Sequence, residues 1–307
     1  MAFPAPSLWL RLRTWVATRL GLWRGRWQRA ELELPVARFP WWPWSRDRWS
    51  HAIYRPGGLR DDAPAPLVLL LHGCGQQALA FAQASGWVQA AERERFRLLC
   101  PEQHAGANPY RCWNWFMPAA QAGRGELDVA MQALARTRAE VACTDVVAVG
   151  LSAGGGLAAL LAFHHAEAFA AVVAVAAPPL LGRVNLQDPR QVMRQGLAAS
   201  PTLAALGLAH CAPLLVLHGA DDEVVTPRCA EQLAEQARSV HERAHGPLQE
   251  QAGDDGITWL RDGRPVVQRR LLPGLAHAWS GGPGGHAHVL RDGPPLVRLA
   301  LAFVRQH

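Results

Sequence analysis

Short apolar runs alternate with helical patterns from residue 48 to near the C-terminus, and this alternation restricts the chain to few folds. The clearest run, at residues 65–73 (Ala-Pro-Leu-Val-Leu-Leu-Leu-His-Gly), is typical of a strand buried on both faces. Strands that alternate with helices predict a parallel, doubly wound sheet with right-handed crossovers. Ligands of such sheets bind beyond the carboxyl ends of the strands, so residues that follow strands are candidates for a functional site. Strands are predicted at 49–56, 65–73, 96–102, 145–150, 169–179, 212–222 and 266–279, and helices at 77–95 and 124–142.

The chain is long enough to bury one large core. It has 307 residues, of which 50% are hydrophobic, and we expect residues 48–307 to form a single α/β domain. Residues 180–211 lie between two predicted strands and are rich in Leu and Ala. They form either a cap over the cleft or an ordinary crossover, and the sequence leaves both open.

The basic residues are unusual in kind and in distribution. All 31 residues counted as Lys or Arg are arginines, which excludes a Schiff-base lysine, a Ser-Lys dyad and the phosphate-binding lysine of a P-loop. Residues 1–50 hold nine Arg against three acidic residues, a balance of +6 that equals the net charge of the whole chain. Residues 51–307 are therefore neutral overall, and nucleic-acid binding by the domain is not expected.

The cysteine pattern does not indicate a metal site. The chain has six cysteines, with no C-x-x-C pair and no clustered His/Cys spacing, so neither zinc nor another metal is expected. A dense disulfide framework is not expected in a chain of this length, whereas one or two bridges remain open if the protein is exported.

Residues 1–47 form a separate region, an N-terminal arm rich in Arg and Trp. Arginines interrupt its apolar stretch, so we expect neither a cleavable signal peptide nor a membrane span, which needs about 18 consecutive apolar residues. A helical projection of residues 8–27 places Leu and Trp on one broad face that also contains Arg19 and Arg26. Such a helix either adsorbs to a membrane or polymer surface or packs on the domain.

A tryptophan cluster follows in the same arm. Trp41, Trp42 and Trp44 lie beside Pro40 and Pro43, which prevent a regular helix. The cluster either grips a polymer or covers the core of the domain, and the sequence does not decide between these interpretations.

Residues 150–154, Gly-Leu-Ser-Ala-Gly, connect a predicted strand to a helical run and match the pattern G-x-S-x-G. In this motif a sharp strand-to-helix turn lifts the serine hydroxyl above the sheet. Gly150 and Gly154 suit the turn because a Cβ at either position would clash. The helix N-terminus behind Ser152 adds N–H groups and a positive dipole that favour an oxyanion. Ser152 is therefore the candidate nucleophile.

A base and an orienting acid should follow the serine in chain order, at the ends of later strands. His277 lies at the end of the last predicted strand, and Asp221 and Asp222 lie at the end of the strand before it. We favour Asp222, because it lies four residues after the histidine of a His-Gly pair and three residues before Val225. Asp221 then has the role of a turn or capping residue.

The remaining histidines near these elements are not expected to act as the base. Two of them, His72 and His218, end strands in His-Gly pairs. Two others, His164 and His165, lie on the helix after the serine, and the last two, His286 and His288, lie in a glycine-rich tail.

The loop after residues 65–73 contains Cys74 and is expected to supply one backbone N–H of an oxyanion hole. Ala153 is expected to supply the other. In an alternative interpretation the thiol of Cys74 is itself the nucleophile, although its predicted neighbourhood is apolar.

Six blocks of the chain resemble successive blocks of the polyhydroxybutyrate depolymerase-like esterases, relatives of feruloyl and acetylxylan esterases. The blocks are LHGCGQ, YRCWNWF, RGELD, GLSAGG, HGADDEVVTP and HAWSGG, and the resemblance runs from about residue 48 to about residue 305. It implies an α/β-hydrolase fold, with a doubly wound, mostly parallel sheet and helices on both faces. It also implies that Ser152, Asp222 and His277 form a catalytic triad.

The resemblance carries further implications for the site. Trp113, Trp115 and Trp279 would contact the substrate, and Cys74 would lie close enough to Cys112 for a disulfide. Two positions depart from the family pattern: Gly75 stands where a threonine is expected, and Cys229 stands where an asparagine is usual.

The sequence thus leads to the hypothesis of a serine carboxylesterase that needs no cofactor and acts on polyhydroxyalkanoate polyester or its oligomers. Feruloyl or acetylated polysaccharide esters are the alternative substrates. A hypothesis of another class is a non-catalytic protein that binds a polymer-granule or membrane surface through residues 1–47. The resemblance favours an extracellular location, whereas the N-terminal residues favour a cytoplasmic or granule-associated one.

Overall fold

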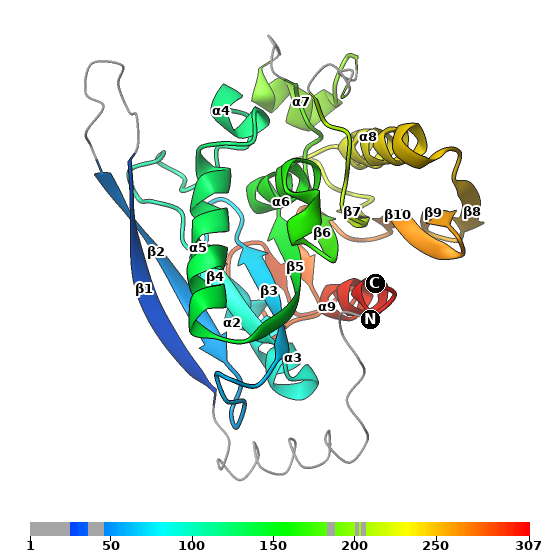
Figure 1. Cartoon of the computed structure of the whole chain (residues 1–307). Coiled ribbons are helices and arrows are strands. Elements are labelled where there is room, and N and C mark those ends of the chain that lie inside the picture. Colours follow the sequence, from blue (N-terminus) through cyan, green and yellow to red (C-terminus); the bar gives the residue numbers. More distant parts are fainter. Residues whose placement is uncertain (1–24, 36–45, 183–187, 200–202, 204–206) are drawn as a thin grey trace.

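One large sheet organises the part of the chain that the computed structural model describes, namely residues 25–35, 46–182, 188–199, 203 and 207–307. Ten strands of this part form the sheet in the order β1-β2-β4-β3-β5-β6-β7-β10-β9-β8 (Figure 1). They are β1 (Arg26–Pro35), β2 (Arg46–Arg55), β3 (Ala65–Leu71), β4 (Arg97–Pro101), β5 (Cys143–Leu151), β6 (Ala171–Val175), β7 (Leu214–Gly219), β8 (Gln249–Gly253), β9 (Gly256–Arg261) and β10 (Arg264–Leu272).

The central strands β4, β3, β5, β6, β7 and β10 run parallel to one another. Strands β4, β6 and β7 are buried at every residue, because helices cover both faces of the sheet. In register, Leu71 lies opposite Gly150 and Leu151 lies opposite Val175, so β3, β5 and β6 end at the same edge. The predicted mostly parallel, doubly wound sheet is therefore confirmed.

Helices lie in two layers, one on each face of the sheet (Figure 1). One layer contains α5 (Glu126–Glu140), α6 (Ala153–His164) and α8 (Pro227–His245), whose apolar residues share one core cluster with the sheet. The other contains α2 (Ala78–Ala84), α3 (Trp87–Glu94) and α9 (Leu296–Val304), whose apolar residues form a second cluster. The shorter elements are α4 (Pro118–Gln121), η1 (Ala166–Ala168), α7 (Pro189–Gln195), β11 (Trp279–Ser280) and β12 (Val289–Leu290).

The sheet extends further toward the N-terminus than the sequence analysis placed it. Residues 26–35, assigned to the arm, form β1 and pair along their whole length with β2 in antiparallel register. Ala30 and Leu32 are two residues apart and share a face, on which Leu32 is buried against the core, whereas Arg29 and Glu31 are exposed. This is the period of a half-buried strand, and it overrides the helical projection that ended at Trp27. The rest of the arm, with its predicted amphipathic helix and its Trp41, Trp42 and Trp44 cluster, lies outside the described residues.

The opposite edge of the sheet is also antiparallel, and the sequence analysis assigned no element there. Strands β8 and β9 form a hairpin that pairs with β10. All five residues of β8 are exposed. In the segment 180–211, α7 packs against α8, and residues 183–187, 200–202 and 204–206 lie outside the described part.

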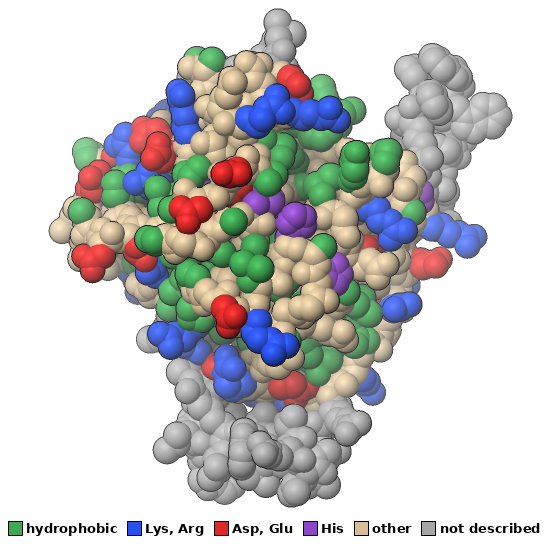
Figure 2. Space-filling view, turned by 180° about the vertical axis from the view of Figure 1, so that it is seen from behind, with side chains coloured by type: hydrophobic (Ala, Val, Ile, Leu, Met, Phe, Trp, Pro, Cys, Tyr) green, Lys and Arg blue, Asp and Glu red, His purple; other side chains and the backbone are tan. Residues whose placement is uncertain are grey.

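Acidic and basic side chains are interspersed on the face shown in Figure 2, with hydrophobic side chains between them. Among the described helices, none combines the length and apolarity needed to cross a membrane.

Candidate active site

Ser152 lies at the sharp turn between β5 and α6. Its backbone is in a strained conformation, with φ of +56° and ψ of −118°, and its N–H donates to the carbonyl of Val175 at 2.8 Å. The turn requires glycine on both sides. A Cβ on Gly150 would lie 2.0 Å from the carbonyl oxygen of Gly154, and a Cβ on Gly154 would lie 2.4 Å from that of Leu71. The strand, the turn and the helix together present the hydroxyl at the carboxyl edge of the sheet.

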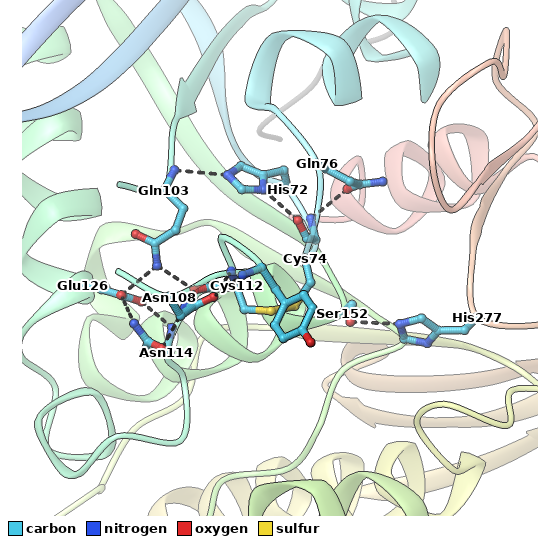
Figure 3. The surroundings of a disulfide bond; sticks show 12 residues. His72, Cys74, Gln76, Gln103, Asn108, Cys112, Asn114, Glu126, Ser152 and His277 are labelled. Atoms are coloured by element: carbon cyan, nitrogen blue, oxygen red, sulfur yellow. Dashed lines mark hydrogen bonds between the residues drawn. A yellow bond between two sulfur atoms is a disulfide. The ribbon is translucent and has the colours of Figure 1, made fainter. Parts of the chain in front are cut away.

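Three residues far apart in the sequence meet at this edge. The Nε2 atom of His277 lies 2.9 Å from the Oγ of Ser152, and its Nδ1 lies 2.7 Å from the Oδ2 of Asp222. Figure 3 shows the imidazole of His277 directed at Ser152. The imidazole therefore bridges the hydroxyl and the carboxylate, an arrangement that can transfer a proton from one side of the ring while holding the other side fixed.

The carboxylate of Asp222 is buried but well supplied with donors. Its Oδ1 accepts hydrogen bonds from the backbone N–H groups of Val224 and Val225, at 2.9 and 2.8 Å, and His218 lies 3.3 Å from its Oδ2. Burial by itself raises the pKa of Asp222, but the hydrogen bonds from His218 and His277, with the charge of His277, outweigh it and hold the pKa well below its usual range. Asp222 thus stays ionised beside the imidazole.

The structure also separates Asp222 from its neighbour. Asp221 is exposed, and its backbone N–H donates to the carbonyl of Leu275 at 3.1 Å. It therefore occupies a turn, and it is Asp222 that meets His277.

Cys74 and Ala153 flank Ser152, as the sequence predicts. Cys74 lies in the loop after β3 and Ala153 is the first residue of α6, and within the described residues neither backbone N–H has a recorded hydrogen-bond partner. The thiol of Cys74 forms a disulfide with Cys112 (Figure 3), so the alternative of Cys74 as the nucleophile is wrong. The pairing that the resemblance implied is present.

Main-chain hydrogen bonds fix the loop that contains Cys74. The N–H of Gly73 donates to the side chain of Gln76 at 2.8 Å, and the N–H of Gly75 donates to the carbonyl of Tyr110 at 2.7 Å. The Nδ1 of His72 lies 2.8 Å from the carbonyl oxygen of Gly73. His72 is fully buried, and this burial lowers its pKa to about 4, so the ring is neutral and structural, as expected from its His-Gly pair.

A cavity of about 220 Å³ opens beside Ser152 and His277. Its walls include three residues that the sequence analysis did not select: Met193 on α7, Val224 after β7, and His288. The contact of Met193 shows that the segment 180–211 contributes one wall of the site.

His288 was set aside as part of a glycine-rich tail, but its ring lies 5.8 Å from that of His277 and nearly perpendicular to it. The spacing of the two histidines in the sequence did not predict this proximity. It results from the path of the loop between them. Figure 2 shows a face on which histidine side chains gather among hydrophobic ones.

The three tryptophans expected to contact substrate do not line this cavity, and that prediction is corrected. Trp113 is fully buried between the rings of Trp49 and His72. Trp279 is also fully buried and donates its indole N–H to a carbonyl at the end of α2, while Trp115 is 4% exposed. These side chains follow strands but turn into the core, where their large apolar area is removed from water.

The described residues contain no group of three or more His, Cys, Asp or Glu side chains placed to bind a metal ion. Two of the other histidines singled out earlier make contacts away from the hydroxyl of Ser152. The Nε2 of His164 lies 3.2 Å from the carbonyl oxygen of Gln121, and His218 contacts Asp222.

Comparison with known proteins agrees with this geometry. Residues 49–250 match the family model described as "Esterase PHB depolymerase". A relative, poly(3-hydroxyalkanoate) depolymerase C from Paucimonas lemoignei, is 28% identical over 247 residues, which cover 76% of this chain and 59% of that protein. The chain thus corresponds to little more than half of that relative's length.

Solved structures show the fold. An acetyl xylan esterase from Aspergillus awamori superposes with a TM-score of 0.65 at 14% identity, covering 91% of this chain and all of that one. A ferulic acid esterase superposes with a TM-score of 0.56 at 15% identity, covering 93% of this chain and all of that one. The fold is that of the α/β-hydrolases.

Proposed function

The chain belongs to the PHB depolymerase family of esterases, and from this premise we propose that it is a serine carboxylesterase acting through Ser152, His277 and Asp222. One observation carries the proposal: the hydrogen-bonded series Ser152–His277–Asp222 at the edge of a cavity. An alcohol becomes a nucleophile at neutral pH only when a base accepts its proton, and this arrangement supplies the base and orients it.

In the proposed reaction, the Oγ of Ser152 attacks the ester carbonyl carbon while the Nε2 of His277 accepts the hydroxyl proton. The tetrahedral intermediate collapses when His277 returns this proton to the leaving alcohol, which breaks the ester C–O bond and leaves an acyl-enzyme. Water then attacks the acyl-enzyme with His277 again as base, and the acid and Ser152 are released. Asp222 remains ionised throughout and stabilises the imidazolium.

The oxyanion of each tetrahedral intermediate needs donors aimed at its position. The N–H groups of Cys74 and Ala153 flank Ser152 without a recorded acceptor in the described residues, which supports their assignment to this role. The N-terminus of α6 adds its dipole at the same point.

The surroundings of the cavity favour an aliphatic, extended substrate, and we propose polyhydroxyalkanoate polyester or its oligomers. Met193 and Val224 give the cavity apolar walls, and Val224 is also one of the few large hydrophobic side chains in the described part that is exposed, at 46%. Two further exposed ones are Tyr110, whose carbonyl accepts from Gly75, and Leu290 in β12, two residues after His288. An apolar chain leaving the cavity would cover this surface.

The test is hydrolysis by wild-type protein and by Ser152→Ala. The variant should lose on the order of 10⁶ in kcat with a p-nitrophenyl butyrate substrate, because the members of a triad act as a unit. A fluorophosphonate probe should label Ser152 in the wild type alone. Absence of labelling and of hydrolysis in the wild type would favour a non-catalytic surface-binding protein instead.

A panel of esters then separates the substrate classes. We expect hydroxybutyrate oligomers to give a higher kcat/KM than feruloyl or acetylated sugar esters. The reverse order would identify a polysaccharide esterase and leave the catalytic assignment intact.

A further inference from the structure

We propose that Glu126 is a positioning residue for the oxyanion hole: through Gln103, Asn114 and the Cys112–Cys74 disulfide, its carboxylate sets the place of the Cys74 N–H. The inference rests on the proposed function. Glu126 is the first residue of α5 and does not touch the cavity beside Ser152, so it would act only through the loops that it binds.

The carboxylate of Glu126 accepts three hydrogen bonds from the segments that contain Gln103 and Asn114. Its Oε1 accepts from the Nε2 of Gln103 and from the Nδ2 of Asn114, both at 2.7 Å, and its Oε2 accepts from the backbone N–H of Asn114 at 2.5 Å. All these donors are neutral. Burial raises the pKa of Glu126, and these three bonds partly oppose that rise. Glu126 is half-buried and has no cationic partner in these bonds, so its ionised form depends on the three N–H donors.

Gln103 connects Glu126 to the disulfide. Its Nε2 also donates to the carbonyl of Cys112 at 2.7 Å, so one amide group bridges the carboxylate and the residue bonded to Cys74. The backbone N–H of Gln103 donates to the Nε2 of His72 at 3.1 Å, and the other ring nitrogen of His72 meets the carbonyl of Gly73. Figure 3 shows these contacts leading from Glu126 to the loop of Cys74 by two routes.

Asn108 holds Cys112 from the other side. Its Nδ2 donates to the carbonyl of Cys112 at 2.7 Å and its Oδ1 accepts the N–H of Cys112 at 2.9 Å. The same Nδ2 donates to the Oδ1 of Asn114 at 3.0 Å, and the Nδ2 of Asn114 in turn donates to Glu126. Both polar main-chain groups of Cys112 are therefore bound to a network that ends at one carboxylate.

The ionised carboxylate gives this network a single orientation together with main-chain groups of Cys112 and His104, which bind the same amides. An amide has one accepting and one donating end, so a cluster of amides alone can be satisfied with several of them turned over. Because both oxygens of Glu126 only accept, the amides of Gln103 and Asn114 must direct their N–H groups toward it. The oxygen of Gln103 is then free to accept the N–H of His104, at 2.8 Å.

Glu126→Gln tests the proposal with little change of volume. One end of the new amide would place an N–H against an N–H of Gln103 or Asn114, and we expect the loop of Cys74 to shift. Losing an oxyanion donor costs about 10² to 10³ in rate, so a displaced donor should lower kcat by about 10- to 100-fold with KM within about twofold. A trifluoromethyl ketone, which forms a tetrahedral adduct with a serine, should bind more weakly by the same factor.

The matched control is Asp128→Asn, in the same first turn of α5. Asp128 accepts from the backbone N–H of Gly125 at 2.7 Å and has no recorded bond to the loops of Cys74 or Cys112. We expect Asp128→Asn to retain wild-type kcat and inhibitor affinity. Loss of kcat in Glu126→Gln without loss of inhibitor affinity would overturn the proposal, as would an unchanged kcat.

A second variant keeps the test valid if Glu126→Gln folds poorly. Gln103→Met removes the bridging amide, and its effect on kcat should match that of Glu126→Gln, with little further loss in the double variant because both act through the same contact. Multiplying effects in the double variant would show independent structural damage and refute the route through Gln103. If the wild type hydrolyses no ester, the proposed function fails, and the role of Glu126 in an oxyanion hole fails with it.

Discussion

The two sides of the Ser152 site are built differently. On the oxyanion side, the loop of Cys74 is cross-linked by a disulfide to Cys112 and connected by hydrogen bonds to a buried network around Glu126. On the acid–base side, the charged carboxylate of Asp222 accepts hydrogen bonds from two backbone N–H groups and from the imidazole of His277. These bonds hold both side chains in place.

This difference follows from what each side must supply. In the proposed reaction, the oxyanion side acts through the position of a main-chain N–H. This group can be positioned only through the segment that contains it, so that segment must be bound firmly to its neighbours. The acid–base side acts through charge, and the groups that stabilise the charge also fix the geometry. Substitutions should therefore act on the acid–base side through charge and on the oxyanion side through position.

Among the substitutions that distinguish the two sides, Asp222→Asn should lower kcat the most. The amide keeps the shape but no longer stabilises the imidazolium or selects its tautomer, so kcat should fall by about 10⁴-fold with a small change in KM. Steady-state kinetics with p-nitrophenyl butyrate measure this. The neighbouring Asp221→Asn is the control and should stay within about twofold of wild type; equal losses in both variants would contradict the assignment of the acid.

A smaller effect on rate is expected for the double variant Cys74→Ala/Cys112→Ala. The backbone N–H of residue 74 remains, and the hydrogen bonds of Gly73 and Gly75 still hold its loop, so kcat should fall by only about 10-fold. The bridge closes a loop with a sequence separation of 38, and its loss should cost about 2–4 kcal/mol of unfolding free energy. Chemical denaturation and kinetics on the same samples check both values. A loss of kcat as large as that of Asp222→Asn would show that hydrogen bonds alone do not hold the N–H of residue 74 in place.

The smallest effect concerns the stability of the folded protein in acid. The stabilising contributions of the two sides should be lost at different pH values. The folded-state pKa of His72 is about 4, below its ordinary value of 6.5, so the unfolded chain binds more protons in this range and stability falls as pH drops from 6.5 to 4. The pKa of Asp222 is lowered from an ordinary value of 3.8, so its contribution is present above that pH and is lost only as the pH falls further. We expect Tm to drop by several degrees between pH 6.5 and 4.

Calorimetry of His72→Asn tests this order. Its Tm should depend less on pH over that window than the wild-type Tm, whereas substitution of the exposed His210 by Asn should leave the slope unchanged. Identical slopes in His72→Asn and wild type would mean that other groups dominate acid unfolding.

Much of the centre of the molecule could be predicted, because local pattern and burial agree there. Strands β3, β4, β5, β6 and β7 are apolar enough to be recognised individually, and the turn at Ser152 has its own glycine requirement. The edges were harder. Strand β1 alternates for only a few residues, and β8 is exposed along its length, so neither has the unbroken apolar signal of a central strand.

The lining of the cavity could not be predicted for a different reason. Met193, Val224 and His288 come from three loops or short elements, and their approach to Ser152 depends on how those segments cross the sheet edge. The buried positions of Trp113, Trp115 and Trp279 are of the same kind, since a tryptophan after a strand can face either the cleft or the core.

The amino-acid sequence alone determined the central alternation of strands and helices, the sharp turn at Ser152 and the candidate partners of that serine, because each depends on residue type and on chain order. Only the tertiary structure decided which side chains line the cavity and how the Cys74 loop is fastened. The physical reason is that side-chain direction and loop packing depend on neighbours remote in sequence, and no local pattern encodes them.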